Sequence, residues 1–239
     1  MCQRPKQTLV VNDVHAKLNS TLMQRCLQPT TIAAVITAVQ QANDRSAPVI
    51  VAGGRHAMGG QQFVTDGILL DLSRLNQVVH FDAVLGQVRV QAGIQWPDLM
   101  RKLHVMQHGC AKQWGIRQKQ TGADRLSVGG AIAANIHGRG LDMAPFIADV
   151  VSFELVDCRG QLQHCSRQHN AELFRLVVGG YGLFGIVVTA TLQLVPRQQV
   201  VREVELCSLA EMIKAVPQRI NAGYLYGDFQ FETSPDSSA

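Results

Sequence analysis

The chain has 239 residues, of which 46% are hydrophobic and 17% charged, and its formal net charge is +4. This high apolar content at low charge excludes a disordered chain, and no apolar run approaches the roughly 18 residues of a membrane-spanning helix. Aromatic residues make up 5% of the chain, too few for the stacking platforms of single-strand nucleic-acid binders. We expect one globular domain, or one domain with part of a second.

The N-terminal sequence MCQRPKQTLVV lacks the apolar core of a secretion signal. The six cysteines are scattered and form no CxxC pair, which indicates reduced packing thiols. The histidines show no ligand spacing with cysteines or carboxylates. These features predict a cytoplasmic protein with no membrane span, no metal site and no nucleic-acid partner.

The first 20 residues are polar, and we expect them to be loose; residues 1–27 would form an N-terminal extension. A helix should begin after Thr31, because apolar residues recur at helical spacing from position 32 to 39. The β-branched run at 48–52 predicts a buried strand. That strand leads directly into a first glycine cluster, GGRHAMGG, at residues 53–60.

The middle of the chain continues with apolar runs that predict strands at 68–72 and 88–92. Pro97 suits the first turn of a helix that carries apolar residues from 99 to 106, and Gly109 suits its end. A second glycine-rich segment, TGADRLSVGGAIAANIHGRG, occupies residues 121–140.

Residues 150–156 and 161–165 predict a hairpin, and Asn170 should cap a short helix after it. A third glycine cluster, GGYGLFG at 179–185, then leads into an alternating strand at 188–194. Beyond Pro196 we expect a strand at 200–206, a helix at 209–216 and a polar end. Forty-odd residues cannot bury a core of their own, so residues 198–239 are expected to be the start of a truncated second domain.

Three glycine clusters in one α+β domain point to an anionic ligand. Glycine allows positive φ angles and a close approach of backbone to ligand, and successive N–H groups in such turns form anion-binding concavities. Residues 111–139 carry five basic residues against one acid. For the individual side chains a solvated basic face is the alternative interpretation. These basic residues are Lys112, Arg117, Lys119, Arg125 and Arg139.

One motif that matches a dinucleotide-binding fingerprint is excluded by the order of the elements around it. Gly180, Gly182 and Gly185 match the spacing of the Rossmann dinucleotide fingerprint. That fingerprint needs a strand before it and a helix after it, whereas here a helix precedes and a strand follows.

The ordered segments AGGRHAMGG, ILLDLSRLN, VQAGIQW, SVGGAIAANIHG and GGYGLFGIVVTATLQLVP strongly resemble the FAD-binding domain of the vanillyl-alcohol oxidase / p-cresol methylhydroxylase (PCMH) flavoprotein family. The resemblance covers most of the chain, and we assign residues 28–197 to this domain. It implies an α+β PCMH-type fold in which two α/β subdomains clasp an extended FAD, with a C-terminal cap domain that is only begun here.

The resemblance also implies which residues bind FAD. The first cluster would wrap the pyrophosphate, the second would lie along the pyrophosphate, ribityl chain and flavin, and the third would place backbone near the flavin and adenine ends. The implied cofactor-binding residues are Gly53, Gly54, Arg55, His56, Ala57, Met58, Gly59, Gly60, Gln61, Thr121, Gly122, Ser127, Val128, Gly129, Gly130, Ala133, Ala134, Asn135, His137, Gly138, Gly182, Gly185, Ile186 and Val187.

His56 has two interpretations. In many relatives the histidine at this point is bonded covalently to the flavin, and a neutral imidazole is a suitable nucleophile. Here its neighbours Arg55 and Ala57 differ from the glycine and serine usual in covalent members. The alternative is a histidine that hydrogen-bonds locally, with FAD held without a covalent bond.

The resemblance implies an FAD-linked oxidoreductase that transfers hydride from a C–H bond of an alcohol, hydroxy acid, sugar or lactone to flavin N5. The partners would be this small-molecule substrate and an electron acceptor, either oxygen or a protein or quinone. No catalytic base can be named. The alternative function is an FAD-binding electron-transfer module, or an inactive fragment without its own substrate site.

Overall fold

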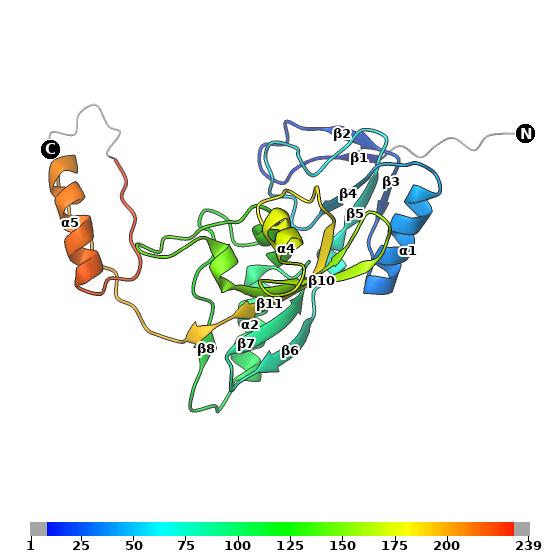
Figure 1. Cartoon of the computed structure of the whole chain (residues 1–239). Coiled ribbons are helices and arrows are strands. Elements are labelled where there is room, and N and C mark those ends of the chain that lie inside the picture. Colours follow the sequence, from blue (N-terminus) through cyan, green and yellow to red (C-terminus); the bar gives the residue numbers. More distant parts are fainter. Residues whose placement is uncertain (1–8, 232–239) are drawn as a thin grey trace, which may run out of the picture.

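The computed structural model describes residues 9–231, which form two α/β units and a C-terminal arm (Figure 1). Two segments lie outside the described residues: residues 1–8, which include Cys2, and residues 232–239, which include the expected polar end at 233–239. Among the residues described, no helix combines the length and apolar character needed to cross a bilayer.

The smaller unit is a three-stranded parallel sheet with one covering helix. Its strands are β3 (Arg25–Leu27), β5 (Ile68–Asp71) and β4 (Val49–Ala52), in the order β3-β5-β4. The expected first helix is α1 (Ile32–Asn43), and the Thr31 side chain caps it by accepting a hydrogen bond from the Ala34 N–H at 3.1 Å. β5 is buried at all four positions, as expected of a central parallel strand.

Residues 9–20 are not loose, and for them the prediction was wrong. β1 (Leu9–Val11) and β2 (Thr21–Met23) form an antiparallel hairpin. Its apolar residues Val11 and Met23 are buried against Ala52 and Leu69 of the smaller sheet. Two buried apolar residues within a polar stretch are therefore enough to anchor the hairpin.

The larger unit is a five-stranded antiparallel sheet in the order β10-β9-β11-β7-β6. The strands that were predicted at 88–92, 150–156, 161–165 and 188–194 all lie in it. The strands are β6 (Val78–Asp82), β7 (Gln87–Gln91), β9 (Val150–Val156), β10 (Leu162–Ser166) and β11 (Ile186–Gln193).

Three helices accompany this sheet: α2 (Trp96–Met106), α3 (Val128–Ala133) and α4 (Ala171–Val177). Short 3₁₀ turns occupy Leu72–Arg74 and Phe146–Asp149. Trp96 and Trp114 are buried, and each indole N–H is hydrogen-bonded, to Gln120 Oε1 and to the Ala83 carbonyl respectively, both at 2.9 Å. Both tryptophans therefore pack in the core of the larger unit.

Asn170 precedes α4 as predicted, but its side chain does not cap the helix. Its φ is 48°, in the left-handed region, and its side-chain amide donates to the His164 carbonyl at 2.8 Å instead. The asparagine therefore ties the start of α4 to β10 rather than to the first turn of the helix.

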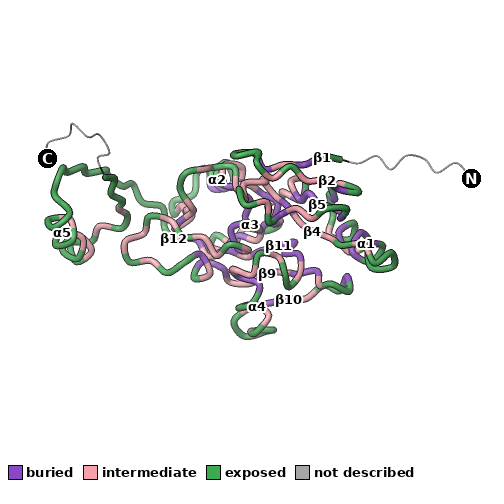
Figure 2. The backbone as a smooth tube through the Cα atoms, turned by 90° about the horizontal axis from the view of Figure 1, so that it is seen from above, coloured by how far each residue is buried: buried purple, intermediate pink, exposed green. Residues whose placement is uncertain are grey.

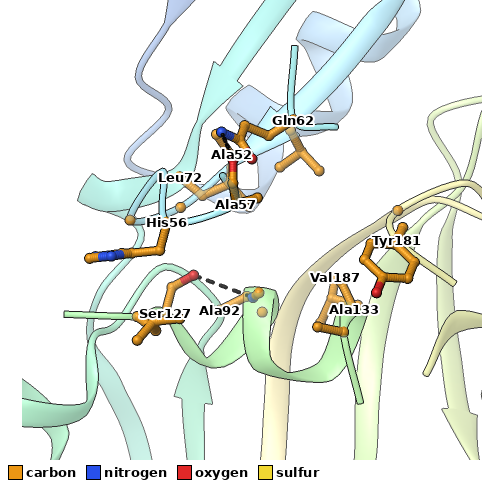
Figure 3. A pocket seen from close by; sticks show the side chains of 18 of the residues that line it. Ala52, His56, Ala57, Gln62, Leu72, Ala92, Ser127, Ala133, Tyr181 and Val187 are labelled. Atoms are coloured by element: carbon orange, nitrogen blue, oxygen red, sulfur yellow. Dashed lines mark hydrogen bonds between the residues drawn. The ribbon is translucent and has the colours of Figure 1, made fainter. Parts of the chain in front are cut away.

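The two units share an apolar contact. Val156 of β9 and Ile186 and Val188 of β11 pack with Val35 of α1 and Leu70 of β5. The ends of the large sheet thus fix the small sheet in place, and the loops that follow β4 come to face α3 (Figure 3).

The C-terminal arm leaves the body after β12 (Val195–Pro196), which pairs with β8 (Trp114–Gly115). The expected strand at 200–206 does not form, because these residues have no neighbouring strand to pair with and their side chains are exposed. The helix predicted at 209–216 is α5 (Leu209–Asn221), which continues through Pro217 and buries no residue. In Figure 2 the arm is almost entirely exposed, whereas the buried positions gather in the two α/β units.

Candidate FAD-binding slot

The two units enclose a slot of about 310 Å³ between the loop after β4, helix α3 and the third glycine cluster (Figure 3). In that view His56 and Tyr181 lie at opposite ends of the labelled side chains, and Ser127 lies below His56. All three glycine clusters contribute to its lining, as the sequence predicted.

The first loop offers a row of unused donors. The backbone N–H groups of residues 54 to 57 donate to no acceptor within the part of the chain that the structure describes. All four residues line the slot. Consecutive free N–H groups at the end of a buried strand form a concavity suited to an anion.

An ion pair holds this loop in shape. Arg55 has a φ of 56°, in the left-handed region, and its Nη2 lies 2.6 Å from Asp71 Oδ2 at the end of β5. Burial raises the pKa of Asp71, but hydrogen bonds from Ser73, Arg55 and Gln28 outweigh burial and leave that pKa below its ordinary value. The carboxylate therefore stays charged and neutralises the arginine, so Arg55 contributes backbone rather than free charge to the slot.

Glycine is required at positions 53 and 54 because the backbone there closely approaches the segment that begins α3. A Cβ on Gly53 would lie 2.1 Å from Ser127 Oγ, and a Cβ on Gly54 would lie 2.4 Å from the Arg125 carbonyl oxygen. The missing side chains let the first loop lie directly against the segment that begins α3.

The His56 ring makes two contacts within the chain. Its Nδ1 lies 2.6 Å from His15 Nε2, and the ring lies near the Arg125 carbonyl. Burial lowers the pKa of His56, and the nearby His15 lowers it further, while the Arg125 carbonyl raises it slightly. At neutral pH the imidazole is therefore uncharged.

Helix α3 forms the opposite wall. Ser127 caps it by accepting from the Gly130 N–H at 3.3 Å. The N–H groups of Val128 and Gly129 donate to the carbonyls of Ile94 and Ala92, at 2.9 and 2.7 Å. Because the chain already uses these N–H groups, α3 serves as a packed wall of small residues opposite the free donors of the first loop.

The third cluster closes the slot through bonds to the end of α3. The N–H groups of Gly179 and Tyr181 donate to the carbonyls of Ile132 and Ala133, both at 3.0 Å. Gly182 and Gly185 adopt φ values of 82° and 136°. Helix α4 precedes this cluster and β11 follows it, the order that excludes a Rossmann phosphate site.

Fourteen of the residues that the resemblance implied line the slot. They are Gly53, Gly54, Arg55, His56, Ala57, Gln61, Ser127, Gly129, Gly130, Ala133, Ala134, Gly182, Gly185 and Val187.

The other implied residues do not line this cavity. They are Met58, Gly59, Gly60, Thr121, Gly122, Val128, Asn135, His137, Gly138 and Ile186. Val128 and Ile186 are buried in the core instead, and the His137 ring contacts the Gly138 carbonyl.

The site residues that the resemblance implied leave out nine residues of the lining, seven of them apolar. These nine are Val51, Ala52, Gln62, Leu72, Ala92, Leu126, Ile136, Val177 and Tyr181. Most of them end or follow a predicted strand or helix, so the one available signal was their position next to a glycine cluster.

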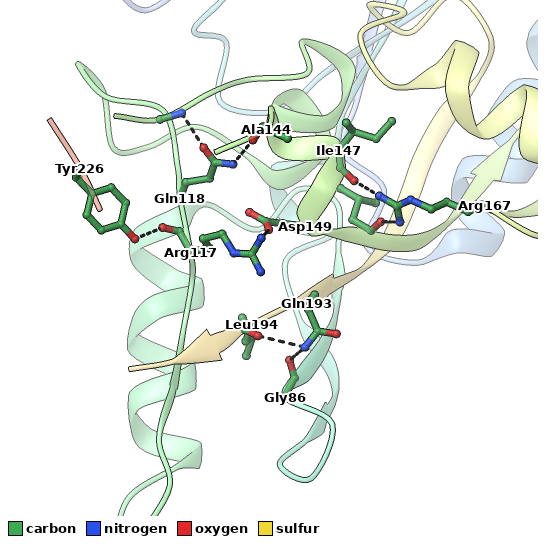
Figure 4. A network of polar contacts seen from close by, with 12 residues as sticks. Gly86, Arg117, Gln118, Ala144, Ile147, Asp149, Arg167, Gln193, Leu194 and Tyr226 are labelled. Carbon is green, nitrogen blue, oxygen red and sulfur yellow. Dashed lines mark hydrogen bonds and ion pairs between the residues drawn. The ribbon is translucent and has the colours of Figure 1, made fainter. Parts of the chain in front are cut away.

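None of the five basic side chains of residues 111–139 lines the slot. Arg117 lies 3.3 Å from Asp149, and the Tyr226 hydroxyl donates to the Arg117 carbonyl (Figure 4). Lys119 pairs with Asp124 at 2.5 Å, and Arg139 pairs with Asp228 at 3.3 Å. Three of the five thus form ion pairs within the chain, and Lys112 Nζ lies 3.9 Å from the centre of the Trp114 ring.

The slot fits the cofactor that the resemblance implies. The free N–H groups of the first loop suit a pyrophosphate, and the apolar walls suit aromatic rings. Gln62 is buried, donates to the Ala57 carbonyl at 2.9 Å, and has a side-chain oxygen with no partner among the described residues. A buried unpaired oxygen costs free energy until a donor reaches it, and FAD carries such donors.

Comparison with known proteins agrees with this geometry. The family described as FAD binding domain matches residues 23–166. The uncharacterized oxidoreductase ORF5 of the fasciation locus of Rhodococcoides fascians is 30% identical over 215 residues, which are 87% of this chain and 46% of that protein. L-gulonolactone oxidase of Mus musculus is 30% identical over 171 residues, covering 71% of this chain and 37% of that enzyme.

Two further relatives extend the comparison. Cytokinin dehydrogenase 3 of Oryza sativa subsp. japonica is 31% identical over 160 residues, or 64% of this chain and 29% of that protein. The solved structure of alkyldihydroxyacetonephosphate synthase has the same fold, with a TM-score of 0.64 at 22% identity, over 76% of this chain and 35% of that one. The chain thus spans less than half the length of these relatives. Its matched region and its slot show that the chain belongs to the FAD-binding domain family, whose cofactor is FAD.

Proposed function

We propose that the chain is the FAD-binding part of an FAD-dependent oxidoreductase. The bound flavin would accept a hydride from a C–H bond of a small substrate and pass the electrons to oxygen or to a protein or quinone acceptor. The observation that carries this proposal is the row of free N–H groups on the first loop, facing an apolar slot. The names of the relatives, an oxidase and a dehydrogenase among them, support the reaction class.

The residues that line the slot would have different roles in FAD binding. Gly54 to Ala57 would donate to the pyrophosphate through their backbone, and the Arg55–Asp71 ion pair would keep that backbone in place. Small residues of α3 and the third cluster, Gly129, Ala133 and Gly182 among them, would leave room for the extended cofactor. The apolar walls would exclude water from it.

We further propose that FAD is held without a covalent bond to His56. The ring nitrogen Nδ1 is already hydrogen-bonded within the chain, to His15 Nε2 at 2.6 Å. This supports the local hydrogen-bonding interpretation of His56 over the covalent one.

The domain division is proposed as residues 28–197 for FAD binding and 198–239 for the beginning of a substrate domain. The exposure of α5 and of the chain before it supports this division, because these residues bury no core of their own. The substrate would be an alcohol, hydroxy acid, sugar or lactone, a class that includes the lactone in the name of one relative.

Anaerobic reduction tests the proposal. The protein is loaded with FAD and mixed, without oxygen, with a panel of alcohols, hydroxy acids, sugars and lactones while the visible flavin band is followed. Bleaching by one class, reversed on admitting air or an artificial quinone, supports the oxidoreductase. Bound flavin that dithionite bleaches but no substrate does would favour an electron-transfer module instead.

A further inference from the structure

The loop of the N-terminal hairpin, residues 12–19, lies against the first glycine loop. The Val14 N–H donates to the Arg55 carbonyl at 3.0 Å, and the Asn19 side-chain amide donates to the Met58 carbonyl. His15 contacts His56 between these two bonds. The family match begins only at residue 23, so this loop precedes the matched region and yet shapes one end of the slot.

The hairpin loop is itself well ordered by one buried carboxylate. Asp13 is 2% exposed, and its Oδ1 accepts from the N–H groups of His15, Ala16 and Lys17 at 2.9, 2.7 and 3.2 Å. Burial raises the pKa of Asp13, but these N–H groups outweigh it and leave the pKa below its ordinary value. The imidazole of His15 is therefore presented from a fixed turn rather than from a free end.

The contact between the two imidazoles fixes the His56 ring. A hydrogen bond between two ring nitrogens needs an N–H on one nitrogen and a lone pair on the other. His56 Nδ1 and His15 Nε2 lie 2.6 Å apart, so this bond holds both rings in one matched pair of tautomers.

We propose that His15 is a positioning residue for the FAD site, because its Nε2 is hydrogen-bonded to Nδ1 of His56 across 2.6 Å and holds that ring in one tautomer and one orientation at the end of the slot. His56 then offers the cofactor a ring of fixed orientation. This inference rests on the proposed function for its effect on FAD, but the tautomer of His56 is a property of the chain alone.

The test compares His15→Ala, His15→Gln and Leu18→Ala with the unsubstituted protein. Gln keeps a side-chain hydrogen-bonding group of similar reach, whereas Ala removes it. Leu18 lies in the same loop with its side chain 85% exposed, so Leu18→Ala controls for disturbance of the loop. Two quantities are measured: the ¹⁵N shifts of the histidine rings without FAD, and the dissociation constant of FAD.

We expect the unsubstituted protein and Leu18→Ala to show His56 as a single neutral tautomer. In His15→Ala the Nδ1 shift of His56 should change, and FAD affinity should fall about five- to tenfold, as the loss of one hydrogen bond implies. His15→Gln should restore most of the affinity and the tautomer.

Two results would overturn the inference: an unchanged His56 ring spectrum in His15→Ala, or a His56 ring that exchanges between two tautomers in the unsubstituted protein. If FAD fails to bind to any variant, the proposed function fails, and the ring spectra still decide the role of His15. If His15→Ala does not fold, the ring spectrum and FAD affinity of His15→Gln decide the role of His15. A folded His15→Gln that has lost both the single His56 tautomer and the FAD affinity contradicts the inference.

Discussion

Arg55 Nη2 and Asp71 Oδ2 lie 2.6 Å apart and join the first glycine loop to the end of the central strand β5. Asp71 is 4% exposed in its side chain and Arg55 is 30% exposed. The pair lets a residue with a left-handed backbone remain in one conformation, and it removes the arginine charge from the slot.

Replacing Asp71 with Asn should therefore weaken both the fold and the slot. A hydrogen bond to a charged group contributes about 1.5–3 kcal/mol, so we expect Asp71→Asn to lower the free energy of unfolding by about 2 kcal/mol. FAD binding should weaken as well. Urea denaturation and FAD titration measure the two effects.

The matched control is Asp98→Asn, which breaks the exposed Asp98–Arg101 pair on α2. Exposed pairs contribute about 0–1 kcal/mol. Equal loss of stability in the two variants would show that the Arg55–Asp71 pair has no special role in the loop.

Gly54→Ala should prevent the first loop from lying against the start of α3. The new Cβ would meet the Arg125 carbonyl oxygen at 2.4 Å, and a backbone atom cannot move aside cheaply. We expect at least a tenfold loss of FAD affinity, or about 1.4 kcal/mol. Gly115→Ala is the control, because its Cβ would find its nearest neighbours 4.0 Å away. Undiminished FAD binding by Gly54→Ala would show that the loop does not form the cofactor cradle.

Ser127→Ala removes the cap of α3. Loss of an N-cap side chain costs about 1 kcal/mol, and here the helix is a wall of the slot, so FAD affinity should fall together with stability. Ser208→Ala removes the cap of α5, which lies outside the slot. We expect this second variant to bind FAD normally, as fluorescence titration can measure; similar losses in both would argue against α3 as part of the site.

The pKa of His56 predicts a pH dependence with a definite sign. Burial and His15 lower this pKa in the folded state, whereas the unfolded chain titrates near 6.5. As the pH falls below about 6.5 the unfolded state takes up a proton first, so the folded protein loses stability until the lower, folded pKa is passed. The difference in unfolding free energy between the unsubstituted protein and His56→Asn, followed from pH 7.5 to 5, should shrink on acidification. A constant difference would mean that His56 is not held neutral.

The strands and helices of the two units could be predicted from the sequence because their patterns are local. The run at 68–72 and the alternation at 88–92 correspond to β5 and β7, and the segment after Thr31 is α1. The hairpin at residues 9–23 and the missing strand at 200–206 could not be predicted, because both depend on whether a distant partner strand or core is present. Val10 and Val201 are both apolar and exposed, yet only the first belongs to a strand.

The site, like the fold, could be predicted from the sequence only where the signal is local. Glycine spacing located the backbone that lines the slot, since glycine marks close approach whatever its partner is. The partners themselves were not visible: Asp71 for Arg55, His15 for His56, and Ala92 for Gly129 each come from another part of the chain. Side chains that complete a site across the fold leave no local pattern in the sequence.

The central claim is that backbone amides of the first loop and the apolar slot hold FAD. The most direct measurement is the visible absorbance spectrum of the purified chain titrated with FAD, taken before and after unfolding in acid. We predict saturable one-to-one binding with a shifted flavin band, and release of all flavin into the supernatant when the protein is unfolded. A folded chain that leaves the spectrum of added FAD unchanged at saturating concentration would contradict the account.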